Sequence, residues 1–149
     1  FLELGWRPRS RRAAGVAMSE ENVEIFRRGH EAFRDSGEEA IFEYLHADID
    51  LTAVEELPGN ETYHGHDGVR RFFQTLREAF GDFGWEPQEF VDLGDHILVA
   101  TRFFAEGRGS GIPVEAMIYN VWTVRQGKAV RVRGYLSRPD ALEAAGLRE

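Results

Sequence analysis

Asn120 is the first candidate for chemistry in this 149-residue chain, because it is a polar residue in an apolar pattern. It belongs to a β-rich run over residues 114–124. Side chains alternate across a strand, so Asn120 shares one face with Ile118 and Trp122. If that face is enclosed, the amide needs a partner, because an unpaired buried polar group costs on the order of 1–3 kcal/mol.

His30 is the second candidate. It lies on the apolar stripe of a helix predicted over residues 20–35, in line with Phe26 and Phe33. An imidazole titrates near neutral pH and can therefore move a proton. The alternative is a core histidine whose ring bonds to Asn120 or to a backbone carbonyl. The residues alone leave both interpretations open.

Other polar motifs favour structural roles. Arg102 lies in an apolar strand, where it can hold a carboxylate or enolate oxygen or can pair outward with Glu115; we favour the ion pair. The cluster over residues 64–67, His-Gly-His-Asp, lacks further ligands at zinc-like spacing and is interpreted as a loop leading into a helix. Residues 107–111 join two strands, unlike a phosphate loop. We therefore expect no metal site and no cofactor.

Composition indicates an ordinary globular domain. Hydrophobic residues make up 42% and aromatic residues 12%, including 11 Phe. The net charge of −8 argues against nucleic acid and anionic membranes as partners. Cysteine is absent and no apolar run reaches membrane-spanning length, so we expect a cytoplasmic protein.

The first 17 residues differ from the rest of the chain. They carry Arg7, Arg9, Arg11 and Arg12 against Glu3, whereas the remainder is strongly acidic. Met18 resembles a native start. We therefore expect residues 1–17 to be a basic extension that is disordered or not native, and residues 18–149 to form the domain.

The order of predicted elements indicates an α+β fold. Helices are predicted over residues 20–35, 38–45 and 68–80, the third capped by Asp67, with a short strand over residues 49–54. Strands follow over residues 85–93 and 96–107, and a hairpin over residues 114–135. Ser137 caps a last short helix. Helices segregated from hairpin-linked strands favour an antiparallel sheet with helices against one face.

Five segments together carry a family resemblance. They are SEENVEIFRRGHEAF from residue 19, YHGHDGVRRFF from residue 63, GRGSG from residue 107, NVWTVRQGK from residue 120 and YLSRPDAL from residue 135. In this order they resemble the SnoaL-like branch of the NTF2-like superfamily, which also holds ketosteroid isomerase, scytalone dehydratase and limonene epoxide hydrolase. The likeness spans residues 18–147.

The resemblance implies an NTF2-like cone, in which a strongly curved antiparallel sheet wraps around three N-terminal helices and a short C-terminal helix follows. It also implies a pocket for a small apolar molecule between helices and concave sheet, and often a homodimer through the outer sheet face. The expected ligand-binding residues are Phe26, Phe33, Tyr44, Phe73, Arg102, Ile118, Trp122, Gly134 and Leu136. Met117, Tyr119, Val121 and Tyr135 are expected to face outward.

The resemblance also suggests catalytic residues. In ketosteroid isomerase-like members an oxyanion-stabilising tyrosine stands where this chain has His30, and a protonated aspartic acid where it has Asn120. Both side chains can then converge on one substrate oxygen. The isomerase's base matches residues 52–54, where no acid stands, so Asp50 or His30 would have to serve.

Two functions follow from this resemblance. The first is a cofactor-free isomerase, cyclase, dehydratase or hydrolase acting on a small apolar substrate with a carbonyl or hydroxyl group. The alternative is a non-catalytic small-molecule binding or dimeric interaction module. A second titratable group near both His30 and Asn120 would favour the enzyme.

Overall fold

The computed structural model describes residues 8–9, 16–57 and 60–146, with side chains from residue 20 onward. In chain order the elements are β1 (Pro8–Arg9), α1 (Val16–Ser36), the 3-10 helix η1 (Glu38–Tyr44), β2 (Leu45–Thr52), β3 (Thr62–His64), α2 (Gly65–Ala79), β4 (Phe80–Asp92), β5 (His96–Gly107), β6 (Pro113–Arg125), β7 (Lys128–Tyr135) and α3 (Arg138–Ala144).

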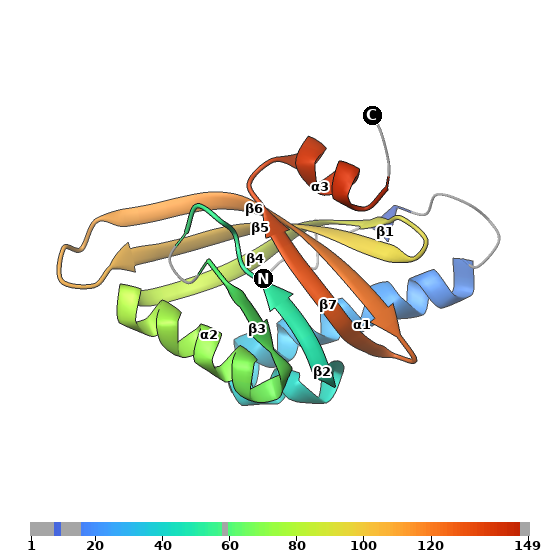
Figure 1. Cartoon of the computed structure of the whole chain (residues 1–149), viewed down its shortest axis with the longest axis horizontal. Coiled ribbons are helices and arrows are strands. Elements are labelled where there is room, and N and C mark those ends of the chain that lie inside the picture. The colour runs from blue at the N-terminus through green and yellow to red at the C-terminus, as the bar shows by residue number, and fades with distance from the viewer. Residues whose placement is uncertain (1–7, 10–15, 58–59, 147–149) are drawn as a thin grey trace.

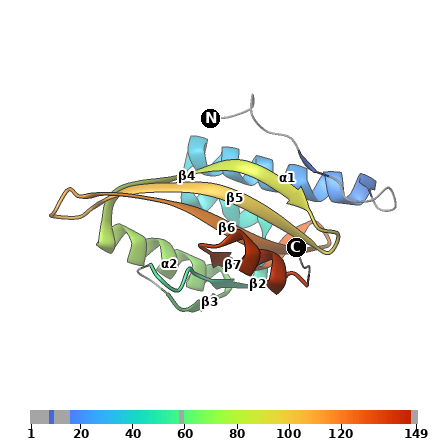
Figure 2. The same cartoon turned by 90° about the horizontal axis from the view of Figure 1, so that it is seen from above.

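The predicted α+β, NTF2-like cone is confirmed. The strands form one curved sheet in the order β1-β4-β5-β6-β7-β2-β3. Figure 1 shows α1 and α2 on one side of the sheet and α3 on the other, and Figure 2 shows how the long strands β4, β5 and β6 curve. The sheet is mixed rather than antiparallel throughout, because β2 runs parallel to β7 and β1 runs parallel to β4. No hairpin joins either pair, so no short turn dictates an antiparallel arrangement.

The predicted starts of two helices were late. α1 begins at Val16 rather than at residue 20, since Ala17 and Met18 are good helix formers. α2 begins at Gly65, where a φ of 72° turns the chain out of β3. Asp67 is therefore not the cap. It lies in the first turn, where its carboxylate accepts a hydrogen bond from Arg70 at 3.0 Å.

Two N-terminal elements differ from the prediction. β2 begins at Leu45, directly after η1, and the short β3 that pairs with it was not predicted. The predicted extension, residues 1–17, lies for most of its length outside the described residues.

The predicted hairpin of β6 and β7 is confirmed. Its turn has positive φ at both central residues, 53° at Gln126 and 79° at Gly127, as a two-residue type I′ turn requires. The turn, together with a register shift between Thr123 and Val124, pairs Asn120 with Gly134. The predicted cap of the last helix is also confirmed, since the Ser137 hydroxyl accepts a hydrogen bond from the Asp140 amide at 3.3 Å.

Apolar packing occupies both faces of the sheet. On the concave face, α1, α2 and β2 bury a cluster that includes Phe26, Ile49 and Phe73. On the convex face, Ala141 and Leu142 of α3 cover a cluster of Val91, Leu98 and Val121. Val121 was expected to face outward as part of an exposed patch. It does face outward, but only 8% of it is exposed because α3 lies over it.

Candidate functional site

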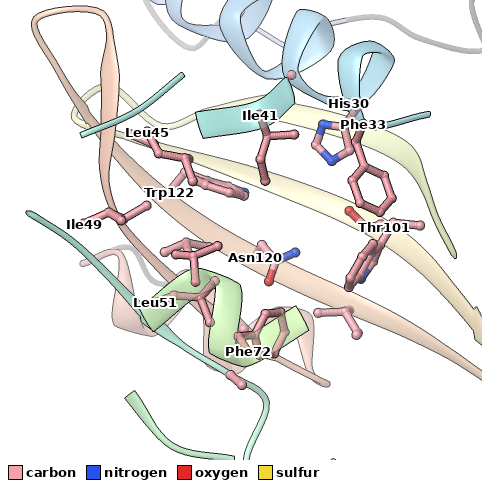
Figure 3. A pocket seen from close by; sticks show the side chains of 18 of the residues that line it. His30, Phe33, Ile41, Leu45, Ile49, Leu51, Phe72, Thr101, Asn120 and Trp122 are labelled. Carbon is pink, nitrogen blue, oxygen red and sulfur yellow. The ribbon is translucent and has the colours of Figure 1, made fainter. Parts of the chain in front are cut away.

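A cavity lies between the helices and the concave face of the sheet. It measures about 170 Å³, taken as the space open to the centre of a water molecule. Residues from α1, η1, β2, α2 and β4–β7 line it, and nearly all of them are apolar. Figure 3 shows their side chains converging on this space from the helices on one side and the strands on the other.

Asn120 lies on the cavity wall, on a strand in the middle of the sheet. Its neighbours in register are Val99 on β5 and Gly134 on β7. A Cβ added to Gly134 would come within 3.0 Å of the Asn120 Oδ1 and 2.9 Å of a Val54 methyl group, so glycine makes room for this amide. Within the described residues, no group hydrogen-bonds to the Asn120 side chain.

His30 reaches the same cavity from α1. Its Nδ1 lies 2.8 Å from the Phe26 carbonyl oxygen, one turn earlier in the helix. A carbonyl only accepts, so Nδ1 carries the proton in this bond and Nε2 is left with a lone pair in the neutral ring. Burial lowers the pKa of His30, and the bond to the Phe26 carbonyl opposes that shift only in part. The imidazole is therefore neutral at neutral pH.

The two predicted catalytic residues therefore share one cavity. Figure 3 shows the imidazole and the Asn120 amide facing the same space, with the amide nitrogen on the side where His30 lies. Most of the predicted ligand-binding residues line this cavity too: Phe26, Phe33, Tyr44, Phe73, Ile118, Trp122 and Gly134. One of the alternatives for His30, a bond to a backbone carbonyl, is also correct, and it leaves the other ring nitrogen available.

Asp50 does not belong to this site. Ile49 and Leu51 line the cavity, so alternation along β2 turns Asp50 to the opposite face. Its carboxylate lies 2.8 Å from Nδ1 of His64 on β3, at the surface. That contact raises the pKa of His64. Asp50 is therefore not positioned to act as the base.

Arg102 and Leu136 also lie away from the cavity. Arg102 faces outward and donates to Glu86 at 3.0 Å and to Glu115 at 2.9 Å, so the ion-pair alternative is correct. Those hydrogen bonds raise its pKa. Leu136 follows the last residue of β7, where the chain turns toward α3, and 38% of it is exposed.

The predictions missed Thr101 and the role of the Trp122 indole nitrogen. Both line the cavity, and neither the Thr101 hydroxyl nor Trp122 Nε1 has a hydrogen-bond partner in the described part of the chain. Only 1% of Thr101 is exposed. Alternation with Val99 and Phe103 places Thr101 on the inward side of β5, but this signal is weak because threonine is common in strands.

The cavity contains few groups that can titrate. The residues that match the base of ketosteroid isomerase-like proteins, Thr52, Ala53 and Val54, line the cavity and include no acid. In the described residues that line it, His30 and Tyr44 are the titratable side chains, and no carboxylate is among them. His30 is therefore the lining side chain in the described residues that can act as a base near neutral pH.

The His64–Asp67 segment is structural, but it is not the predicted loop, because His64 ends β3 and residues 65–67 begin α2. His66 Nε2 bonds to the Leu45 carbonyl at 3.0 Å, and its ring packs on Phe42. Over residues 20–57 and 60–146, no group of three or more metal-ligating side chains comes together. No helix in the described part of the chain is long and apolar enough to cross a membrane.

Comparison with solved structures finds the same fold repeatedly. The chain is similar to TerC co-crystallised with polyporic acid, with 26% identity over 78% of this chain and 92% of that one and a TM-score of 0.70. An NTF2-like protein from Burkholderia thailandensis is 22% identical over 84% and 95% of the two chains, with a TM-score of 0.72. A protein of ketosteroid isomerase-like fold from Catenulispora acidiphila, in complex with trimethylamine, is 15% identical over 83% and 93%, with a TM-score of 0.65.

Sequence comparison identifies the family. Among curated proteins, none matches the chain significantly. The sequence model of the SnoaL-like domain matches residues 21–132, which include most of α1, the strands from β2 through most of β7, and both His30 and Asn120. The chain therefore belongs to the SnoaL-like domain family, and its fold is NTF2-like.

Proposed function

We propose that the protein binds a small, mostly apolar molecule through a carbonyl or hydroxyl oxygen, which lies between Asn120 and His30. The observation that carries this proposal is the Asn120 amide, which faces an apolar cavity and has no partner among the described residues. A ligand oxygen placed there removes the cost of the unpaired amide.

The two side chains offer a ligand hydroxyl group one hydrogen-bond donor and one acceptor. Asn120 Nδ2 donates a hydrogen bond, whereas His30 Nε2, with Nδ1 occupied by Phe26, accepts one. A ligand hydroxyl can use both at once, and a ligand carbonyl can use the amide. Because no charged side chain lines the cavity in the described residues, the ligand is expected to be neutral.

The size of the cavity agrees with such a ligand. If the measured space is treated as a sphere and widened by the radius of water, about 1.4 Å, the envelope is on the order of 500 Å³, within the range of small-molecule pockets. Two structurally similar proteins were crystallised with small molecules, polyporic acid and trimethylamine. These cases support a binding role for the fold.

Calorimetric titration with 2-naphthol and with naphthalene tests the binding proposal. We expect the unmodified protein to prefer 2-naphthol by roughly threefold to tenfold, as one net hydrogen bond provides, and Asn120→Leu to weaken this preference, since His30 Nε2 is still able to accept from the naphthol. Asn60→Leu removes an exposed loop amide and is expected to keep the full preference. If the unmodified protein binds neither compound, or if Asn120→Leu prefers the naphthol as strongly as the unmodified protein does, the proposal is wrong.

Catalysis by His30 is the second candidate, and its neutral, shielded imidazole is the observation that favours it. Nε2 can take a proton from the carbon next to a ligand carbonyl. The C–H electron pair then forms an enolate whose oxygen accepts from Asn120, and the proton can return to the same or another carbon. Isomerisation, cyclisation and dehydration can all begin with such a step, and this proton transfer itself requires no cofactor.

Hydrogen–deuterium exchange at the α-carbon of 2-tetralone in D₂O, followed by proton NMR, tests this candidate. We expect the protein to accelerate exchange and His30→Gln to abolish the acceleration, while His64→Gln, a surface substitution, leaves it unchanged. Binding of 2-tetralone without accelerated exchange would leave the non-catalytic alternative as the function.

Three further predictions accompany this proposal: a homodimer through the outer sheet face, a cytoplasmic location, and a domain that begins near residue 18.

A further inference from the structure

Thr101 has a buried hydroxyl that nothing in the described structure satisfies. Its Oγ1 has no hydrogen-bond partner, only 1% of the residue is exposed, and the residue lines the cavity. Figure 3 shows the hydroxyl oxygen pointing into the cavity. A buried hydroxyl without a partner is unfavourable, whereas valine has the same shape without that cost. Val99, on the same face of the same strand, shows that valine fits this surface.

The register of the sheet places Thr101 apart from the oxygen site at Asn120. Thr101 pairs with Ile118, and Asn120 lies two residues further along β6. Diagonal neighbours of this kind on adjacent strands lie about 7–8 Å apart. The two polar groups therefore lie at separate positions on the cavity wall, and two oxygens on one rigid ring system can reach both.

We propose that Thr101 is a second anchor of the cavity, so that the ligand is a neutral, mostly apolar molecule with two oxygen functions, one at Asn120 and one at Thr101. This inference rests on the proposed binding function and narrows its ligand class. A threonine hydroxyl donates and accepts, so the second oxygen belongs to a hydroxyl or a carbonyl group. Thr101 then discriminates between ligands with one and with two oxygens, because a buried polar group left unpaired penalises the simpler molecule.

A matched pair of substitutions tests this role. Thr101→Val removes the unpaired hydroxyl, whereas Thr123→Val removes a buried hydroxyl that lies 3.0 Å from His96 Nδ1 on the convex side of the sheet. Each variant is titrated with 2-naphthol and with the 1,5-, 2,6- and 2,7-dihydroxynaphthalenes, whose two oxygens differ in separation. Thermal unfolding without ligand is measured in parallel.

We expect the unmodified protein to bind at least one of the diols about threefold to tenfold more tightly than 2-naphthol. Thr101→Val is expected to lose that advantage, to keep its affinity for 2-naphthol, and to unfold at the same or a higher temperature. Thr123→Val is expected to keep both affinities and to unfold at a lower temperature.

The outcomes separate this inference from the proposed function. If the unmodified protein binds 2-naphthol but no diol more tightly, or if Thr101→Val keeps the preference for the diol, the second anchor is wrong and the binding function stands. A lower unfolding temperature for Thr101→Val would show that the hydroxyl supports the fold, which also overturns the inference. If neither 2-naphthol nor any diol binds, the proposed function itself fails.

Discussion

His30 acquires its properties from two contacts. The Phe26 carbonyl holds the proton on Nδ1, which leaves Nε2 as an acceptor toward the cavity. The apolar surroundings lower the pKa of the ring, so it stays neutral where an exposed histidine is partly charged. A neutral ring can act as a base or accept from a hydroxyl group. Protonation removes both abilities.

The lowered pKa of His30 predicts a dependence of stability on pH. Below its ordinary value of about 6.5, the unfolded chain binds a proton that the folded chain does not, so the free energy of unfolding falls as the pH drops. His30→Gln is expected to reduce this fall. Denaturant titrations between pH 8 and pH 5 measure it.

His64 is a useful control, because its pKa is shifted in the opposite direction to that of His30. Its pKa is raised by Asp50, so its contribution to stability is fully present below about pH 6.5 and is lost as the pH rises through the higher folded value. His64→Gln should therefore make the acid-induced loss steeper. If the free energy of unfolding falls equally steeply with decreasing pH in the unmodified protein and in His30→Gln, the His30 ring is not shielded from solvent.

Gly134 is expected to be sensitive to a single methyl group. Gly134→Ala places a Cβ against the Asn120 amide and Val54, which should cost about 1–3 kcal/mol of stability and weaken 2-naphthol binding. Gly81→Ala is the matched control, because its Cβ meets nothing within 4 Å in another strand of the same sheet. Urea unfolding and calorimetry compare the two. If the two variants have similar free energies of unfolding and similar affinities for 2-naphthol, the space around Asn120 is not tightly packed.

Alternation along strands predicted the facing of the residues in β6. It placed Ile118, Asn120 and Trp122 on the inward face, where they line the cavity. Asp50 was named because the resemblance calls for a base and no acid stands at residues 52–54, whereas alternation along β2 turns it away from the cavity. The missing partner of the Thr101 hydroxyl could not be predicted, since it is a property of the assembled cavity.

At the scale of elements, the β6–β7 hairpin positions the site. Its turn and the register shift between Thr123 and Val124 together bring Gly134 beside Asn120. Gly127→Ala forces a Cβ into a left-handed conformation and should cost about 1–2 kcal/mol. Gln126→Asn should instead gain roughly 0.5 kcal/mol, because asparagine tolerates a positive φ better. Urea midpoints that move in the same direction for both variants would contradict this account of the turn.

The ends and neighbours of elements were harder to predict than their existence. Every predicted helix and strand is present, since apolar periodicity is a local property. The starts of α1 and α2 were wrong because good helix formers and Gly65 precede the expected caps. The pairing of β2 with β7 depends on contacts between distant parts of the chain, which periodicity does not encode.

The outer face of the sheet is where the predicted homodimer is expected to form. α3 covers one part of it, and Met117 of β6, 38% exposed, lies on the part that α3 leaves open. If the predicted homodimer forms there, Met117→Asp should produce a monomer in sedimentation experiments. Ile112→Asp alters a residue that is 63% exposed near the tip of the β5–β6 hairpin and should leave the dimer intact. A monomeric unmodified protein would rule the dimer out.

The cavity is the feature on which the account of function depends, and NMR observes it directly. Titration of isotope-labelled protein with 2-naphthol is expected to shift the side-chain amide resonances of Asn120, with the same saturation curve as calorimetry. Saturable binding that leaves the Asn120 amide resonances unmoved would contradict the claim that this amide holds the ligand's oxygen.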